Sequence, residues 1–473
     1  MYLMIQNKGT CSFDALYTLG ATSSRNSSNS NIIGQFGSGS LLGVLALLRN
    51  NIRPVFYNGL LRLEYFTKTI SINTIDGDTS HEVLCVHISG KDNNKSYNKT
   101  EQLNVTMDFG SMDWSEVWHG MREIISNAID ASYKLFNNMS GITITPVPDM
   151  RGKSGFTRVF LPLETPINDI YKNLHNLFLH FNLSYNPNVV LLGKSLSSKP
   201  ARFYRKGVFV GESNSKLPSI YDYNIPNLEI DESRNIQQYS ANARAAQAIV
   251  MADSNIVEQF LNILVESGGS KYYEQQFDYY YLSGSLFDSD IKSKAKTHWL
   301  KAFNSFKDVV LSDNTAHLND LIVSKNKIPM CLHSDPFYKL LNIDFGVPNW
   351  TSVITVDEME GRTFSNPNEF QLNIFDYFWS LFKSRSLALK DKPSLKLFNQ
   401  NVSTTESYTK DSFIYIRSDV SGDLFNRRLI EQLAAYLCGD NEISTLYRTL
   451  LINFVLNTKE DSILMSSHVD CLL

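Results

Sequence analysis

A glycine-rich loop, Gly34–Gly39, leads into Leu41–Leu48, a run of eight residues with no polar side chain. Such a run favours burial, and it is far shorter than the roughly 20 residues of a membrane-spanning helix. We therefore expect a buried helix that starts at the glycines. Glycines at this spacing let successive N–H groups point inward, and a helix N-terminus adds partial positive charge, so the loop suits phosphate. The alternative is a flexible turn before a core helix, because the loop lacks the Lys-Ser/Thr of a Walker motif.

A second polar pattern lies on a predicted helix that begins near Asp113, where Glu116 can complete a capping box. Glu123, Asn127 and Asp130 are spaced i, i+4, i+7 and share one face of this helix. An amide oxygen can ligate magnesium, and a carboxylate one turn away can polarise water, so the pattern suits nucleotide hydrolysis. The alternative is that these residues form the solvated face of an amphipathic helix.

Together the two patterns resemble motifs of the GHKL ATPases, the family with the Bergerat fold. The segment Ile33–Gly39 (Ile-Gly-Gln-Phe-Gly-Ser-Gly) is similar to the G2 motif, and Glu123–Ala131 (Glu-Ile-Ile-Ser-Asn-Ala-Ile-Asp-Ala) is similar to the N box. In wording the ninety-kilodalton heat-shock chaperones are nearest, and the MORC-type and mismatch-repair ATPases are more distant. The resemblance implies that the chain binds ATP and Mg²⁺.

The first strand-like run leads into a segment that resembles the G1 motif, Asp-x-Gly-x-Gly, with two departures. Asn7 stands where the family's adenine-reading aspartate lies, Gly9 matches the first glycine, and Cys11 replaces the second. An amide oxygen can still accept from the adenine amino group, although its N–H₂ loosens the base preference. Leu19–Arg25 resembles the lid segment. The family runs N box, G1, lid, G2, whereas here the N box comes last, so the resemblance implies a circular permutation.

The resemblance also implies roles for single residues. Glu123 is the general base, Asn127 is the magnesium ligand, and Asp130 supports the adenine end. The remaining nucleotide-binding positions are Asn7, Gly9, Gly34, Gln35, Gly37, Ser38 and Gly39. Arg122 orients Glu123 or contacts phosphate, unless it is an ordinary exposed arginine. The segment 155–161 resembles the family's Gly-Thr strand, or it is only the strand that follows the N-box helix.

Downstream, two segments resemble the family's second domain, which is of the ribosomal-S5-like type and supplies a basic residue to the γ-phosphate. Phe203–Val210 is similar to an exposed strand of that domain, and Asn227–Asn235 is similar to the loop that carries the arginine. Arg234 is therefore the first candidate and Lys206 the second, because a positive charge there stabilises the transferring phosphoryl group. The alternative is ordinary surface salt bridging.

Apolar spacing predicts further helices over Ile167–Phe181, with Thr165 as its cap, and over Ser240–Ser267 and Leu424–Cys438. The segment Leu429–Tyr436 has the texture of a metallopeptidase helix but lacks both zinc-binding histidines, so it predicts no metal site.

Composition bounds the class of protein. The net charge of −4 over 473 residues does not favour wrapping of DNA, and nucleic acid is not an expected partner, although a local basic patch stays open. Five scattered cysteines favour free thiols in a reducing compartment. We expect no membrane segment and a cytoplasmic location. The Asn-, Lys-, Ser- and Tyr-rich composition and the unusual motif order suggest a virus or mobile element, which would place the chain in host cytoplasm.

The sequence thus predicts an α+β protein in three parts. They are a permuted GHKL ATP-binding α/β sandwich over 1–163, an S5-like transducer over 164–268, and a mixed, largely helical partner-binding or structural region over 269–473. The expected function is that of a slow Mg²⁺-dependent ATPase, which acts as a nucleotide-operated clamp or chaperone-like factor and forms a homodimer. The alternative is a non-hydrolysing, ATP-regulated interaction protein, such as a host-takeover or counter-defence factor, with an unknown protein partner.

Overall fold

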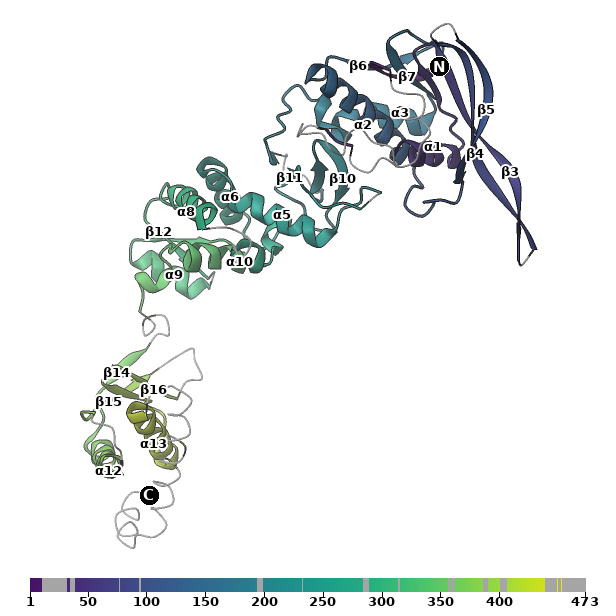
Figure 1. The fold of residues 1–473 in the computed structure, drawn as a ribbon. Coiled ribbons are helices and arrows are strands. Elements are labelled where there is room, and N and C mark those ends of the chain that lie inside the picture. Colours follow the sequence, from purple (N-terminus) through teal and green to yellow (C-terminus); the bar gives the residue numbers. More distant parts are fainter. Residues whose placement is uncertain are drawn as a thin grey trace. The chain divides into compact units, whose positions relative to one another are not determined.

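The computed structural model describes residues 1–10, 32–34, 39–75, 77–92, 95–193, 199–231, 233–283, 289–313, 315–355, 358, 362–385, 390–399, 406–438, 449 and 452. The chain forms two compact units: 1–305 with 333–345, and 306–332 with 346–473. Figure 1 shows the order of the helices and strands along the chain. Helices and strands occur in both units, which confirms the α+β class. The first unit contains both segments that resemble GHKL proteins, and the predicted division into three parts stays a prediction.

An antiparallel seven-stranded sheet, ordered β5-β4-β3-β2-β7-β1-β6, forms one side of the first unit. Its strands are β1 (Tyr2–Lys8), β2 (Val55–Asn58), β3 (Leu61–Thr74), β4 (Gly77–Asp92), β5 (Lys95–Thr106), β6 (Ile142–Val147) and β7 (Phe156–Pro162). Ile5, Val159, Phe56 and Leu63 are successive register partners across β1, β7, β2 and β3, so they lie on one face of the sheet.

Two helices cover that apolar face. Helix α1 (Gly39–Arg49) buries seven consecutive residues, Leu41–Leu47, and packs over β3, β4 and β5, which confirms the expected core helix. Helix α2 (Val117–Phe136) packs on β1 and β7. It begins at Val117 rather than near Asp113, because Glu116 is its N-cap and forms the capping box with His119. Glu116 is therefore the cap of the box itself, three residues after the predicted cap Asp113.

The expected helix over Ile167–Phe181 is broken into three pieces. They are α3 (Thr165–Lys172), α4 (Leu174–Leu177) and the 3₁₀ turn η2 (Leu179–Phe181). The cap of α3 is Glu164, so the prediction for Thr165 was wrong. The break at Phe178 has a packing cause, since this fully buried residue is extended and bridges Val208.

The expected single strand over Phe203–Val210 is a hairpin. Strands β9 (Arg202–Arg205) and β10 (Val208–Glu212) are joined by Lys206 and Gly207, both of which have positive φ and so turn the chain. They belong to a sheet ordered β10-β9-β11-β8, which also contains β8 (Leu191–Gly193) and β11 (Tyr221–Asn224).

The expected helix over Ser240–Ser267 is two helices, α5 (Gln238–Val250) and α6 (Ser254–Glu266), bent by 111°. The carboxylate of Asp253 ends the continuity, because it accepts from the backbone N–H groups of Asn255 and Ile256 and caps α6. Among the described residues no single helix is long and apolar enough to cross a membrane. The bent pair α5 and α6, taken together, has that length and composition. The rest of the first unit contains η3 (Tyr273–Gln276), α7 (Tyr279–Leu282), α8 (Ser289–Phe303), α10 (Asp335–Lys339) and η4 (Leu340–Asp344).

The second unit is mixed, since it contains two sheets beside its helices. Parallel β12 (Val309–Ser312) and β13 (Ile328–Cys331) pack with α9 (Ala316–Ser324) and η5 (Trp350–Ser352). A second sheet, ordered β14-β15-β17-β16, is covered by α12 (Glu369–Arg385) and α13 (Gly422–Cys438). Its strands are β14 (Thr363–Ser365), β15 (Ser394–Asn399), β16 (Ser407–Lys410) and β17 (Phe413–Arg417). Helix α13 matches the expectation for Leu424–Cys438 within two residues.

Candidate functional site

Glu123 lies on α2 against the start of α1. Only 4% of Glu123 is exposed, so it is not part of a solvated helix face. A Cβ added to Gly39 would lie 2.1 Å from Glu123 Oε2, which means that the carboxylate occupies the space a side chain would need. The same closeness holds one turn away, where a Cβ on Gly120 would lie 2.6 Å from the carbonyl oxygen of Gly43. Glycine at these crossings brings the predicted base to the N-terminus of α1.

Arg234 reaches Glu123 from the downstream loop. Arg234 Nε lies 2.7 Å from Glu123 Oε1, and Nη2 donates to Oε2 at 3.0 Å. Arg234 is 6% exposed and has positive φ (61°), so the backbone turns to direct this side chain inward. The structure therefore brings together two predicted site residues that are 111 positions apart, and surface salt bridging is the wrong interpretation of Arg234.

Arg122 completes a buried cluster of three charges. It is 2% exposed, so the alternative of an exposed arginine is wrong. Its Nε lies 3.6 Å from Glu123 Oε1, and its Nη2 donates to the carbonyl of Ser233, beside Arg234. Burial lowers the pKa of Arg122 to about 10, against the opposing attraction of Glu123, and the group stays charged at neutral pH. The cluster thus holds two buried guanidinium groups beside one carboxylate, and guanidinium groups suit an anion.

Asp130 fixes the start of the glycine loop. Its Oδ1 and Oδ2 accept from the backbone N–H groups of Ile33 and Gly34 at 2.6 and 2.7 Å. Burial raises the pKa of Asp130, and the two backbone donors oppose the rise. Asp130 is thus an anchor of the loop, a contact that the predicted role at the adenine end did not include.

Asn127 lies one turn after Glu123 and is exposed. Its Nδ2 donates to Ser40 Oγ at 3.0 Å, which places the amide at the first turn of α1. This contact uses the donor side of the amide, and the oxygen is the atom that a magnesium ion takes. Ser40 is a site residue that the sequence reasoning missed, although its position beside Gly39 was a usable signal.

Lys206, the second candidate cation, contacts the loop backbone. Its Nζ donates to the carbonyl of Ile32 at 2.6 Å, from the β9–β10 turn. Partial burial lowers the pKa of Lys206, Arg205 lowers it further, and Asp130 opposes both. The side chain therefore ties the hairpin of the small sheet to the base of the glycine loop.

The predicted adenine end lies near the C-terminal end of α2. A Cβ on Gly9 would lie 3.2 Å from Leu135 Cδ1, about 18 Å along α2 from Glu123 at 1.5 Å per residue. Asn7 is half-buried at the end of β1, and its Nδ2 donates to the carbonyl of its neighbour Lys8. Strand β7 pairs with β1, and Thr157 Oγ1 donates to the Gly9 carbonyl. The strand that directly follows α2 is β6, so the second interpretation of 155–161 is wrong.

Three predicted phosphate-binding residues, Gln35, Gly37 and Ser38, lie outside the described residues, as do Cys11 and the lid-like segment Leu19–Arg25. Within the described part of the chain no cluster of three or more His, Cys, Asp or Glu gathers as metal ligands. A magnesium ion held by one amide oxygen and by nucleotide phosphates does not need such a cluster. Asn127 at the first turn of α1 fits that mode of binding.

Cys85 and Cys331 are free thiols. Cys85 is buried and Cys331 is half-buried, and neither forms a disulfide. This confirms the expectation of free thiols for these two cysteines.

Comparison of the chain with models of protein families, with curated proteins and with solved structures finds no match.

Proposed function

We propose that this chain binds ATP with Mg²⁺ where the N-terminus of α1 meets α2, and hydrolyses it slowly. The observation that supports the proposal most is the position of Glu123. Its carboxylate is buried against Gly39 at the helix start, one turn from Asn127 and paired with Arg234. A helix N-terminus attracts phosphate, and the buried guanidinium groups of Arg122 and Arg234 add to that attraction.

In the proposed mechanism Asn127 would hold the magnesium ion through its amide oxygen, and the ion would reduce the charge of the triphosphate. Glu123 accepts a proton from the water that attacks the γ-phosphorus, while the bond from that phosphorus to the bridging oxygen breaks and ADP leaves. Both carboxylate oxygens of Glu123 are engaged by Arg234, so the pair must open before Glu123 can contact the attacking water. The terminal phosphate is an alternative anion for Arg234, and the exchange of partners would free Glu123.

The exchange would also move the loop that carries Arg234. This loop follows β11 of the four-stranded sheet β10-β9-β11-β8, so nucleotide binding would shift that sheet against α2. We propose that the protein acts through this shift as a clamp or chaperone-like factor. Such closure steps often limit turnover. We also propose that the chain dimerises when ATP binds and that the second unit contacts a further protein partner.

The second candidate is an interaction protein that binds ATP without hydrolysing it. The same Arg234–Glu123 pair favours it, because Arg234 occupies the carboxylate of the predicted base. The amide at Asn7, in place of the family's carboxylate, also favours it.

The test is phosphate release from ATP and Mg²⁺ by the full chain and by Glu123→Gln, with nucleotide binding measured in parallel. Glu229→Gln, an exposed position in the same loop region as Arg234, is the matched control. We expect release to fall about 100-fold or more in Glu123→Gln, with binding retained and the control unchanged. Binding without release by the wild type would select the interaction protein. No nucleotide binding by the wild type would refute both candidates.

A further inference from the structure

One face of the four-stranded sheet in the second unit combines aromatic rings with basic side chains. Helices α12 and α13 pack on the opposite face, where they bury Leu395, Leu397, Ile414 and Ile416. Side chains alternate along a strand, so the residues between these point away from the helices. They are Lys396, Phe398, Phe413, Tyr415 and Arg417, joined by Phe364 of β14 and by Tyr408 and Lys410 of β16.

The rings on this face form one connected cluster. Tyr408 and Tyr415 stack at a centroid distance of 4.6 Å, and Phe364 lies 5.3 Å from Tyr415 at the other side. Phe398 is fully buried beneath Tyr408. Phe364 differs from the others, because 42% of it is exposed. It therefore offers a ring surface that the cluster supports but does not cover.

Cations lie over the same rings. The Arg362 guanidinium is 4.1 Å from the Tyr408 centroid, and Lys396 Nζ is 4.8 Å from that of Phe413. Lys410 is exposed at the end of β16, and Arg417 forms an ion pair with Asp419 at 2.6 Å. Asp411 is exposed in the β16–β17 turn, and Glu406 lies beside Arg417, whose backbone N–H donates to the Glu406 carbonyl. Among the described residues, four cations therefore lie on or beside the rings of this face, together with three carboxylates.

We infer that this face binds single-stranded nucleic acid. Unpaired bases stack on aromatic rings, and their phosphates are held by neighbouring lysine and arginine groups. Phe364 is assigned to a base, and Arg362 and Lys396 are assigned to phosphates. The alternation of rings and cations across neighbouring strands is what favours this occupant over an apolar peptide, which would gain nothing from the charges. This inference does not depend on the proposed ATPase, and it departs from the expectation that nucleic acid is not a partner.

The test is fluorescence anisotropy of the full chain with a labelled oligothymidylate of about 20 nucleotides, and with the matching oligouridylate. Stacking and phosphate contacts use groups that DNA and RNA share, so both should bind. We expect Phe364→Ala to weaken binding roughly 5- to 150-fold, the range for loss of one stacked base. Arg362→Gln with Lys396→Gln should reduce the slope of log affinity against log salt by about 1.4.

Two controls lie on the opposite side of the sheet. Tyr377→Ala removes an aromatic residue of α12 that is 44% exposed, and Arg427→Gln removes a cation of α13. Both should bind like the wild type, and thermal melting would establish that every variant is folded. The inference is overturned by absence of binding at about 50 mM salt. Equal binding by the Phe364 variant and the wild type, or equally tight binding of a blunt duplex, would also overturn it.

Discussion

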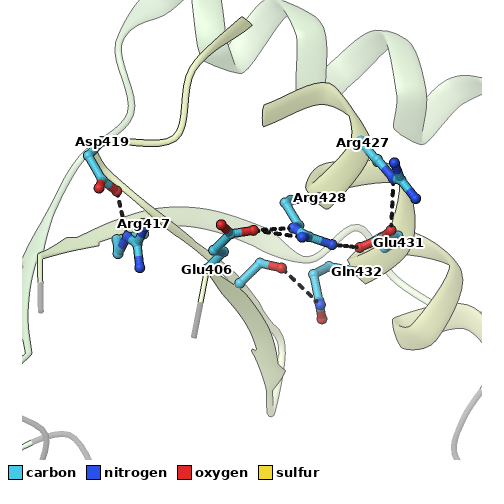
Figure 2. A network of polar contacts seen from close by, with 8 residues as sticks. Glu406, Arg417, Asp419, Arg427, Arg428, Glu431 and Gln432 are labelled. Atoms are coloured by element: carbon cyan, nitrogen blue, oxygen red, sulfur yellow. Dashed lines mark hydrogen bonds and ion pairs between the residues drawn. The ribbon is translucent and has the colours of Figure 1, made fainter. Parts of the chain in front are cut away.

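The two units each contain a cluster of arginine and glutamate side chains with similar distances and very different surroundings. In the first unit Glu123 and Arg234 are 2.7 Å apart, with side chains 5% and 7% exposed. In the second unit Arg428 lies 2.6 Å from Glu406 and 2.7 Å from Glu431, with side chains 26–31% exposed (Figure 2). Figure 2 shows Arg427 on the far side of Glu431, so the exposed network extends along α13.

The pKa shifts of the arginines show what burial changes. The pKa of Arg428 is raised, first by its hydrogen bond to Glu431 and then by that to Glu406. The pKa of Arg122 is lowered, because the loss of solvent outweighs its attraction to Glu123. The same two kinds of side chain therefore strengthen each other at the surface and form a costly site in the interior. Such a cost in the interior is typical of functional sites.

Removal of the central carboxylate of each cluster should give the largest difference in lost stability between the two clusters. Glu123→Ala leaves Arg122 and Arg234 buried without the carboxylate that lies closest to both, and we expect a loss of about 3–5 kcal/mol in the free energy of unfolding. Glu431→Ala should cost about 1 kcal/mol or less. Hydrogen exchange read separately on α2 and α13 measures each loss locally. Equal losses in the two units would contradict the distinction.

Much of this buried site could be predicted from the sequence, and the reason lies in spacing. Glu123, Asn127 and Asp130 lie on one helix, where the period of 3.6 residues fixes their relative positions. The glycines at 34 and 39 indicated a loop whose backbone N–H groups point inward before a helix. The pairing of Glu123 with Arg234 depends on tertiary contacts between segments 111 positions apart, so only the resemblance pointed to Arg234.

Other elements were missed for local reasons. The helix expected over Ser240–Ser267 has a continuous apolar pattern, but the Asp253 cap splits it. The single strand expected over Phe203–Val210 is a hairpin, because Lys206 takes a positive φ that is uncommon for lysine. The sheet of the second unit was missed because its strands are short and apolar on both faces, with aliphatic residues on one face and aromatic residues on the other, so their alternation is weak.

Acid should destabilise the first unit through His180. Burial lowers the pKa of His180 to about 4 from 6.5, and its ring packs between those of Tyr133 and Tyr185. The unfolded chain binds this proton more tightly, so stability is complete above pH 6.5 and is lost as the pH falls towards 4. The loss amounts to about 3 kcal/mol. Denaturation across this pH range should show the slope in the wild type, and His180→Phe should flatten it.

The anchor of the glycine loop gives a smaller effect. Asp130→Asn keeps one acceptor and places an N–H₂ group against a backbone donor, so we expect a loss of about 1–3 kcal/mol of stability. Because Ile33 and Gly34 lead into the proposed phosphate site, nucleotide affinity should fall by a similar factor, about tenfold. Calorimetric titration with ATP and Mg²⁺ measures the second effect. Unchanged affinity in Asp130→Asn would show that the loop does not contribute to binding.

Salt should have the smallest effect and should sharpen the contrast between the clusters. Raising ionic strength from about 0.1 to 1 M shortens the Debye length from about 10 to 3 Å. The penalty of Glu431→Ala should then become too small to measure, while that of Glu123→Ala should change little, since solvent ions do not reach a buried pair. Urea denaturation at the two ionic strengths provides the comparison. A Glu123→Ala penalty that disappears in salt would mean that the site is open to solvent.

The proposal that α1 and α2 form a nucleotide site is tested most directly by calorimetric titration of the full chain with ATP and Mg²⁺. The matched variants are Gly39→Ala, whose Cβ would lie 2.1 Å from Glu123 Oε2, and Gly155→Ala, whose Cβ would meet nothing within 4 Å. Because Gly155 has positive φ, its variant also shows what backbone strain alone does. We predict one ATP bound per chain in the wild type and in Gly155→Ala, and affinity at least tenfold weaker in Gly39→Ala. Absence of binding in the wild type, or equal affinity in all three proteins, would contradict the account.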